Sequence, residues 1–583
     1  MRSQNIQKDI NLIGDELIEK FILKDNKASK YVSSFFSDKN ILSHSKNKSD
    51  QFTDYQRKIL IEELTLQYSK VETSRQTSSN IKLLSNSKTL TVTTGHQLNI
   101  FSGPLMVIYK IAQVISITNY LNLNIKGFNY VPIFWIASED HDFEEISDVN
   151  LKKNKIKWNI DSKNMPVGEI ELNDFMEVVG GYKDSIIDFE FKGKLEILID
   201  EAYKKGDTLS AATIKFINSL FAKHGLVIID SNKKVFKKSF IDNFKNEILD
   251  SRCEVDSSSQ ILKIKKDIKS FKPQVNPSDV NFFKITSLGR KRIRKKDRLF
   301  RVDDENEYTS LDLINQIETN PELFSPNVLM RPLYQEKILP NVCYLGGPNE
   351  LKYWMQLKLY FENSNVQFPI LKLRTSAFII DEKTSKKLSK SNIDIKYFFG
   401  KLDDLVNHKI NSTSKLNLSL NSLKNKLTNQ FNELREISIN IDKSFVGALN
   451  AQERKQLKGL DELEKKLIKA MVQMANLTRK GFEQKELGQT KGVSMAGSPT
   501  FTANTSLDST FGDVKTLTGT VSTVSATESQ GSVIMDGTDA NGADSGDSII
   551  LEDATEPSNI IFAIGLVYIY PILKNMVFIY RNN

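Results

Sequence analysis

The chain has 583 residues, of which 39% are hydrophobic and 26% charged, and its formal net charge is +8 at pH 7. This length is sufficient for two or more domains with sizeable cores, and the composition is that of an ordinary soluble protein. The modest net charge argues only weakly for nucleic acid as a partner and carries no information about the fold.

The cysteines and the N-terminal segment indicate the compartment. Cys253 and Cys343 lie far apart without CxxC or zinc spacing, which indicates a reducing compartment or indifference to redox state. Cys343 lies inside a predicted strand, so we expect it to be a small buried residue rather than a nucleophile. The N-terminal segment has no apolar run of the kind found in signal peptides. We therefore expect a cytoplasmic protein.

The first strong pattern is a strand, a turn and a helix at residues 89–120. Residues 1–85, which precede it, are polar with helical spacing and predict helices packed outside a sheet. The β-branched run 89–93 is typical of a buried strand, and apolar periodicity predicts a helix over 105–120. We expect Ser102 to cap this helix and Pro104 to occupy its first turn.

The turn between that strand and helix is the first candidate site. In open α/β sheets, ligands bind at this strand end, where the helix N-terminus attracts anions. We predict a catalytic role for His96, placed where a phosphate or carboxylate would bind. The predicted substrate or nucleotide ligands are Thr94, Gly95, Gln97, Ser102 and Gly103. A plain turn with His96 capping a loop explains these residues equally well.

A second buried strand is predicted over 130–136, and an acidic segment follows it directly. The segment has three explanations: a metal site, a substrate site, or the N-cap and first turn of a helix. Adjacent residues of an extended segment cannot all face one ion, so we predict no metal site. We favour a substrate site that holds an ammonium group or orients a base. The candidates are Glu139, Asp140 and His141 as catalytic residues and Asp142 as a binding residue.

Two further regions follow. A third sheet strand is predicted over 225–230, ending on an acid. The basic run 289–296 resembles a nucleic-acid patch. It lies between two alternating segments, 282–285 and 299–302, so we favour a solvated hairpin.

A second strand-turn-helix pattern lies at residues 341–361, and a fifth strand is predicted over 368–373. A second glycine-lined helix N-terminus in one sheet suggests a site between two halves. The predicted binding residues of this half are Arg331, Gln335, Gly346, Gly347, Glu350 and Tyr353.

The last two regions differ from the core. Leucine and isoleucine spacing over 416–441 and 457–474 predicts two helices joined near 443–453, an antiparallel coiled-coil arm suited to stabilising the fold or forming a homodimer. The tail from about 480 is rich in Ser, Thr, Gly and Asp and predicts disorder. Its apolar run 560–573 is shorter than the roughly 20 residues of a spanning helix, so we expect no membrane insertion.

Several long motifs, in order, resemble one family. They are TTGHQLNIFSGPLMVIYKI, YVPIFWIASEDHDFEEI, FSPNVLMRPLYQEKILPNVCYLGGPNELKYWMQLK and the leucine-rich arm. Together they resemble the cysteine-adding enzymes of bacillithiol biosynthesis, the cysteine ligase or BshC family, from about residue 50 to about 472. In this family one expects a longer second arm helix and a helical C-terminal segment. Beyond about residue 472 the chain departs from that pattern.

The resemblance implies an α/β fold with a Rossmann-like, nucleotidyltransferase-like parallel-sheet core, insertions and an antiparallel coiled-coil arm. The regions we assign are an N-terminal helical segment (1–85), the first core half (86–235), an insertion (236–330), the second core half (331–384), the arm (385–476) and the atypical tail (477–583).

The implied reaction is amide formation between cysteine and glucosaminyl malate, which gives bacillithiol. Because amide formation in water is uphill, we expect ATP, carried with Mg²⁺, to activate the carboxylate. His96 and the adjoining helix N-terminus would stabilise phosphate charge, and Glu139, Asp140 or His141 would act as the base. Arg331 and the Gly346–Gly347 turn would hold the malyl carboxylates. The alternatives are another synthetase-like enzyme, a non-catalytic coiled-coil scaffold and, last, a nucleic-acid-binding protein.

Overall fold

The computed structural model describes residues 15–151, 154–186, 191–302, 306–375, 420–441, 445–487, 532–536 and 548–552. The chain forms two compact units, one of residues 13–379 and 556–583 and one of residues 1–12 and 380–555. Each unit is described by itself.

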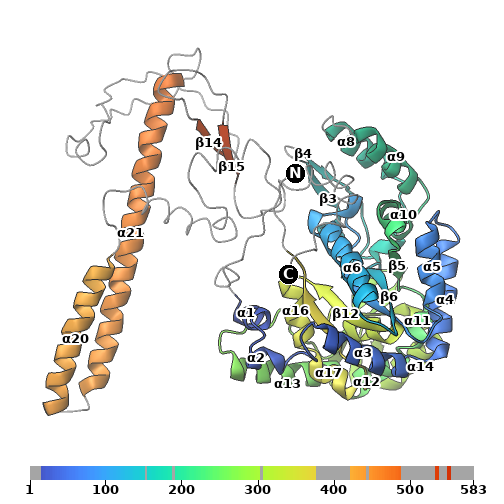
Figure 1. Ribbon diagram of the computed structural model, residues 1–583, viewed down its shortest axis with the longest axis horizontal. Helices are drawn as coiled ribbons and strands as arrows, with labels where there is room; N and C mark the ends of the chain where they lie inside the picture. Colours follow the sequence, from blue (N-terminus) through green and yellow to red (C-terminus); the bar gives the residue numbers. More distant parts are fainter. Residues whose placement is uncertain are drawn as a thin grey trace. The chain divides into compact units, whose positions relative to one another are not determined.

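A five-stranded parallel sheet forms the centre of the first unit (Figure 1). Its strands are β1 (Thr89–His96), β2 (Asn129–Ile136), β5 (Val227–Asp230), β12 (Asn341–Gly346) and β13 (Ile370–Leu373). The spatial order is β13-β12-β1-β2-β5, and the pairings are parallel. The chain proceeds from β1 to one side and later returns to its other side, so the topological switch point lies between β1 and β12. The predicted Rossmann-like core and its five strands are confirmed.

Helices and small sheets surround this sheet. The N-terminal helices are α1 (Glu16–Ile22), α2 (Asn26–Ser29), α3 (Asp38–Gln51), α4 (Asp54–Tyr68) and α5 (Arg75–Leu83). The helices of the middle region are α6 (Leu105–Asn124), α7 (Phe143–Ile146), α8 (Met176–Ser185), α9 (Lys192–Ala202), α10 (Leu209–Phe221), α11 (Lys234–Lys238), α12 (Ile241–Asp250) and α13 (Arg252–Asp267). The later helices are α14 (Ser310–Thr319), α15 (Arg331–Ile338), α16 (Pro348–Met355) and α17 (Lys358–Asn363). The short strands are β3 (Asp148–Leu151), β4 (Asn154–Lys157), β6 (Phe282–Thr286), β7 (Gly289–Arg292), β8 (Arg294–Lys296), β9 (Leu299–Arg301), β10 (Glu307–Tyr308) and β11 (Phe324–Pro326).

The central strands are apolar throughout because both faces of the sheet are covered. Side chains alternate along a strand, so successive residues of β2 enter different cores. Val131, Ile133 and Trp135 pack in one core with residues of α4 and α12. Phe134 and Ile136 pack in the opposite core with residues of α6 and α10. This double coverage leaves the carboxyl ends of the strands as the place where polar side chains gather.

The turn before α6 differs from the prediction. Phe101, Ser102 and Gly103 have positive φ angles of 52°, 70° and 61°, so the chain turns tightly over three consecutive residues. The extended N-cap conformation falls on Pro104, and α6 begins at Leu105. The prediction that Ser102 caps the helix is therefore wrong, because a residue in the left-handed region cannot take the extended N-cap conformation.

Two other local predictions need correction. The single helix expected over 351–361 is two helices, α16 and α17, which are separated at Gln356 and Leu357. The single solvated hairpin expected around 289–296 is two hairpins, because β6 pairs with β7 while β8 pairs with β9.

The second unit contains the coiled-coil arm. Its helices are α20 (Asn421–Ile441) and α21 (Val446–Leu487), which lie side by side (Figure 1). Lys424 bonds to Asp461 and Glu464, and Arg435 bonds to Glu453. From Lys424 to Arg435 the chain advances along α20, while their partners run backwards along α21 from Glu464 to Glu453. The two helices are therefore antiparallel, which confirms the predicted arm. Residue 416, at the start of the predicted repeat, lies outside the described residues, and dimerisation stays a prediction.

The tail is more ordered than predicted in two places. Helix α21 continues to Leu487, and β14 (Ser532–Asp536) pairs antiparallel with β15 (Ser548–Glu552). The other tail residues, the apolar run 560–573 included, lie outside the described residues. Among the helices that the structure describes, none is long and apolar enough to cross a membrane.

We expect Gly103→Ala to lower the free energy of unfolding by roughly 2–4 kcal/mol, because it combines a positive φ with overpacking. An added Cβ would lie 2.3 Å from Cβ of Asn99. Gly127→Ala is the matched control, because Gly127 has a φ of +85° and no atom within 4 Å of an added Cβ. Urea unfolding of both variants measures the difference, and equal losses would show that the turn tolerates a side chain.

Candidate functional site

His96 lies at the carboxyl end of β1, beside the switch point of the sheet. Its Nδ1 accepts a hydrogen bond from the Gln97 N–H at 2.8 Å, which places the ring proton of the neutral imidazole on Nε2. Burial lowers the pKa of His96 to about 3, helped by the charge of Lys110 and opposed by that of Glu350. His96 is therefore neutral at pH 7 and offers a hydrogen-bond donor, not a positive charge.

A buried lysine joins the β1 turn to the β12 turn. Lys110 of α6 is 2% exposed, and its Nζ donates to the carbonyl of Gly95 at 2.6 Å and to both Glu350 oxygens at 3.0 and 2.9 Å. Glu350 also accepts from the Gly347 N–H at 2.7 Å and from the Tyr344 hydroxyl at 2.9 Å. Sequence reasoning missed Lys110, although a lysine within an apolar helix was a visible signal.

Two arginines complete this half of the site. Arg331 donates to the Tyr353 hydroxyl and to Oε1 of Gln335, each at 3.1 Å. The main-chain N–H of Arg374, just after β13, donates to the carbonyl of Gly346 at 2.9 Å. Arg331, Arg374 and Lys110 all interact with Glu350. Three cations around one carboxylate leave a positive balance that favours an anionic ligand.

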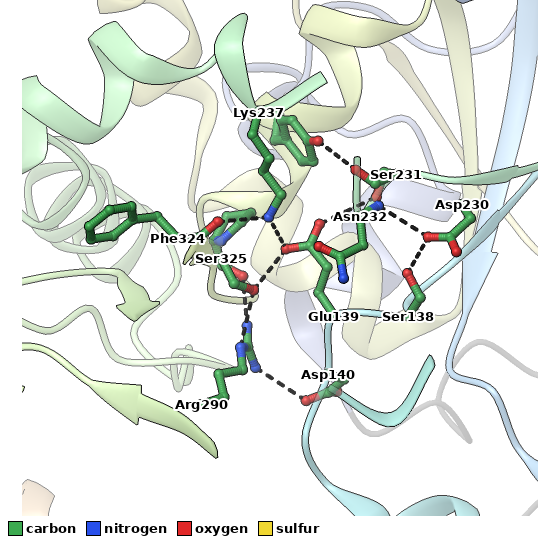
Figure 2. Close-up of polar contacts among 12 residues, drawn as sticks. Ser138, Glu139, Asp140, Asp230, Ser231, Asn232, Lys237, Arg290, Phe324 and Ser325 are labelled. Atoms are coloured by element: carbon green, nitrogen blue, oxygen red, sulfur yellow. Dashed lines mark hydrogen bonds and ion pairs between the residues drawn. The ribbon is translucent and has the colours of Figure 1, made fainter. Parts of the chain in front are cut away.

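The second half of the site follows β2 and β5 (Figure 2). Glu139 accepts a hydrogen bond from Lys237 of α11 and one from the Ser325 hydroxyl at 2.7 Å. Lys237 is fully buried and also donates to the Phe324 carbonyl at 2.8 Å. Burial lowers the pKa of Lys237, and the charge of Glu139 opposes this shift. Glu139 is thus held in a buried ion pair, not presented as a free base.

Asp140 is bonded by Gln97, His141 and Arg290. It accepts from Gln97 Nε2 at 2.9 Å, from the His141 N–H at 2.8 Å and from Arg290 Nη1 at 3.4 Å. Burial alone would raise the pKa of Asp140, but hydrogen bonds from His141 and Gln97, with the charge of Arg290, lower it below its usual range. Asp140 is therefore ionised at neutral pH.

Arg290 is the second residue that sequence reasoning missed. Its side chain leaves the basic run and is buried, donating to the Ser325 hydroxyl at 3.1 Å and the Pro326 carbonyl at 2.9 Å. Its Nη1 lies 3.0 Å from His141 Nδ1. The other charged residues of the run 289–296 are typical of a solvated face, and nothing in the sequence of the run distinguished Arg290 from them.

The other acids have local roles. Asp142 accepts from the Glu145 N–H at 3.2 Å and caps α7, so the helix-cap explanation holds for this residue. Asp230 accepts from Ser138 Oγ at 2.5 Å (Figure 2). It also accepts from Ser210 Oγ at 2.6 Å, and the two bonds fix the end of β5. Within the described ranges, no group of three or more His, Cys, Asp or Glu side chains is placed to hold a metal ion.

Gln97 connects the two halves. It follows His96 directly, and its Nε2 donates to Asp140 Oδ2 at 2.9 Å and Glu145 Oε2 at 2.7 Å. Thr94, on the central strand β1, donates to the Leu345 carbonyl of β12 at 2.8 Å. The structure thus places His96, Gln97 and Asp140 along one edge of the sheet, with Ser102 and Gly103 in the turn before α6. Gln335 is instead fully buried on α15, where it bonds to Arg331 and Glu336.

The neutrality of His96 has a measurable effect on stability. As pH falls from about 6.5 toward 3, the unfolded chain binds a proton that folded His96 does not, so folding stability decreases in this window. We expect His96→Asn to reduce the proton uptake on unfolding by up to about one proton near pH 5. Urea unfolding of both proteins at several pH values measures this. An unchanged slope would show that His96 titrates normally in the folded state.

Comparison with known families agrees with the fold. Residues 1–375 match the N-terminal Rossmann-like domain of bacillithiol biosynthesis BshC, and residues 377–477 match its C-terminal coiled-coil domain. The match begins at residue 1, earlier than the expected 50, and ends close to the predicted departure at about 472.

Curated relatives carry the name "Putative cysteine ligase BshC". The one from Flavobacterium johnsoniae is 40% identical over 73% of this chain and 79% of its own length. The one from Christiangramia forsetii is 42% identical over 71% and 77%, and the one from Cytophaga hutchinsonii is 31% identical over 71% and 77%. The chain therefore belongs to the BshC family of ligases.

Proposed function

We propose that this protein joins the carboxyl group of cysteine to the amine of glucosaminyl malate and so forms bacillithiol. The observation that carries the proposal is the division of one sheet edge into a cationic half at β1 and β12 and an acid–histidine half after β2. The names of the relatives supply cysteine and ligation, and the family description supplies bacillithiol.

Amide formation requires an activated carboxylate, and ATP, bound with Mg²⁺ as a substrate, is the activator we propose. A cysteine carboxylate oxygen attacks a phosphoryl group of ATP, and a P–O bond of ATP breaks to release pyrophosphate or ADP. The amine nitrogen then attacks the acyl carbon, and the C–O bond to the phosphoryl group breaks. Lys110, Arg331 and Arg374 stabilise the negative charge of the phosphate and carboxylate groups. The Nε2–H of His96 donates a hydrogen bond to the oxygen on which charge develops.

The amine must lose a proton as the amide forms, and we assign this proton to His141. Glu139 is neutralised by Lys237, and the low pKa of Asp140 makes it a weak base. The ring of His141 is partly exposed, and its Nδ1 lies 3.0 Å from Arg290 Nη1 and 3.5 Å from Asp140 Oδ1. Because a guanidinium can only donate, Nε2 accepts the proton when Nδ1–H turns from Arg290 to the Asp140 carboxylate, which then stabilises the imidazolium that forms.

Substitution of the two histidines separates these roles. We expect His96→Ala to lower kcat by roughly 10²–10³, the scale for loss of one donor to a developing oxyanion. His141→Ala removes the base, and we expect a loss of roughly 10²–10⁴ that is smaller at high pH. Initial rates of bacillithiol formation measure both, with His224→Ala as a histidine control remote from this edge. Full activity in either variant would remove that residue from the mechanism.

Ligand binding provides a test that does not need turnover. A ligand that binds only the folded state adds about 2.7 kcal/mol at a hundredfold excess over its dissociation constant. We expect glucosaminyl malate, cysteine and ATP each to raise the melting temperature of the full chain. A folded protein that responds to ATP but not to glucosaminyl malate would indicate a synthetase with another acceptor. No response to any of them would favour a scaffold.

A further inference from the structure

A buried ion pair that the proposed chemistry does not use lies toward the amino ends of the strands. Lys48 of α3 and Glu336 of α15 have side chains that are 4% and 0% exposed. Lys48 Nζ lies 3.7 Å from Glu336 Oε2 and donates to the Glu336 main-chain carbonyl at 2.8 Å. Burial of two charges carries a large desolvation cost and often adds no net stability, so the pair calls for another role.

The second oxygen of Glu336 organises the residues around it. Glu336 Oε1 accepts from Gln335 Nε2 at 3.0 Å and from Asn341 Nδ2 at 2.7 Å. Gln335 is itself fully buried, and its Oε1 accepts from Arg331 Nη1 at 3.1 Å. Because the amide nitrogen and oxygen of Gln335 are fixed to one plane, the bond to Glu336 determines which atom Gln335 presents to Arg331.

The same chain of hydrogen bonds continues into the site. Arg331 Nη2 donates to the Tyr353 hydroxyl at 3.1 Å, and the Arg331 guanidinium carbon lies 6.0 Å from the centroid of the Tyr344 ring. Tyr344 donates to Glu350, which holds Lys110. Arg331 is the first residue of α15 and belongs to the cationic half of the site, and Glu336 lies near the other end of the same helix. A continuous polar path joins Lys48 to the residues around His96.

We propose that Lys48 and Glu336 are positioning residues, which act through Gln335 to hold the Arg331 guanidinium in the orientation that binds an anionic group of the substrate. The proposal rests on the proposed function in one respect, namely that Arg331 binds this anion. Neither Lys48 nor Glu336 touches substrate. Their effect is to fix Arg331, the cation that α15 contributes to the cationic half.

The chemistry of Glu336 provides a conservative variant. Burial raises the pKa of Glu336 to about 7, and the charge of Lys48 opposes this shift. Its Oε2 has no hydrogen-bond partner among the described residues, whereas Oε1 has two. A glutamine at this position keeps Oε1 as an acceptor for both amides. Glu336→Gln therefore preserves the positioning contact, and Glu336→Ala removes it.

Asp256 offers a matched control for the loss of a buried carboxylate. It is 4% exposed and accepts from Arg252 Nε at 2.9 Å and Asn363 Nδ2 at 2.8 Å. It thus has a cation and an amide as partners, as Glu336 does. Asp256→Ala reports the effect of general destabilisation, because neither of these partners contacts Arg331.

Steady-state kinetics of the full chain give the first test. We expect Glu336→Ala to raise KM for glucosaminyl malate about tenfold, the scale of one hydrogen bond to a charged group, with a smaller change in kcat. Arg331→Met should raise the same KM at least as much, and Glu336→Gln should restore it to within about threefold of the unmodified protein. Asp256→Ala should leave KM unchanged. An equal rise in Asp256→Ala, or no rise in Glu336→Ala when Arg331→Met does raise it, would overturn the proposal.

Crystal structures of the unmodified protein and Glu336→Ala decide the question without turnover. We expect the guanidinium of Arg331 to leave hydrogen-bond distance of Gln335 and Tyr353 in the variant, while the sheet is unchanged. An unmoved guanidinium would overturn the positioning role. Absence of turnover in the unmodified protein would count against the proposed function alone, because the position of Arg331 is read from the structure.

Discussion

The cationic half of the site depends on the burial of the Lys110 ammonium group within an apolar helix. An isolated ammonium group in such a place would lose its charge or unfold the helix, because its desolvation is unfavourable. Glu350 and the Gly95 carbonyl prevent this, and they come from the first turn of α16 and from the end of β1. The ion pair therefore requires both elements to be in place at once, beside His96 at the switch point of the sheet. Sheet topology brings the two elements together, and the ion pair fixes their separation.

The same device occurs at two other positions in the core. Lys237 of α11 pairs with Glu139 after β2, and Lys48 of α3 pairs with Glu336 of α15. In each pair a helical lysine meets a glutamate of a different element, and the lysine also donates to a main-chain carbonyl. Apolar residues of similar volume often pack as stably as buried ion pairs. These pairs therefore contribute positioning and not net stability, because each one fixes a strand end or a site residue in place.

The sheet could be predicted from the sequence because its strands are local features. Runs such as 130–136 are apolar on both faces, which is typical of parallel strands, and this run is followed directly by an acidic segment. His96, Asp140 and Glu350 could be predicted for the same reason, since parallel strands bring their carboxyl ends to one edge. Arg290 could not, because its partner Asp140 lies 150 positions away and the surrounding charges are typical of a solvated face. The cap of α6 was predicted wrongly because three consecutive positive φ angles cannot be inferred from Phe101 or Ser102, neither of which favours them.

The link through Gln97 joins the cationic half to the acid–histidine half, in which Lys237 and Arg290 balance Glu139 and Asp140. A charged side chain between them would pair with one half and distort the other, whereas a neutral amide donates to Asp140 without changing the balance of charge. Its main-chain N–H meanwhile fixes the tautomer of His96. The neutral imidazole is the consequence that matters for chemistry, because burial and, after it, the charge of Lys110 make a positive charge on His96 unfavourable. A donor that develops no charge of its own can stabilise an oxyanion as it forms without holding the ground-state carboxylate too tightly. For the amide-forming reaction proposed above, this electrostatic arrangement favours the transition state of acyl transfer over simple retention of an anion.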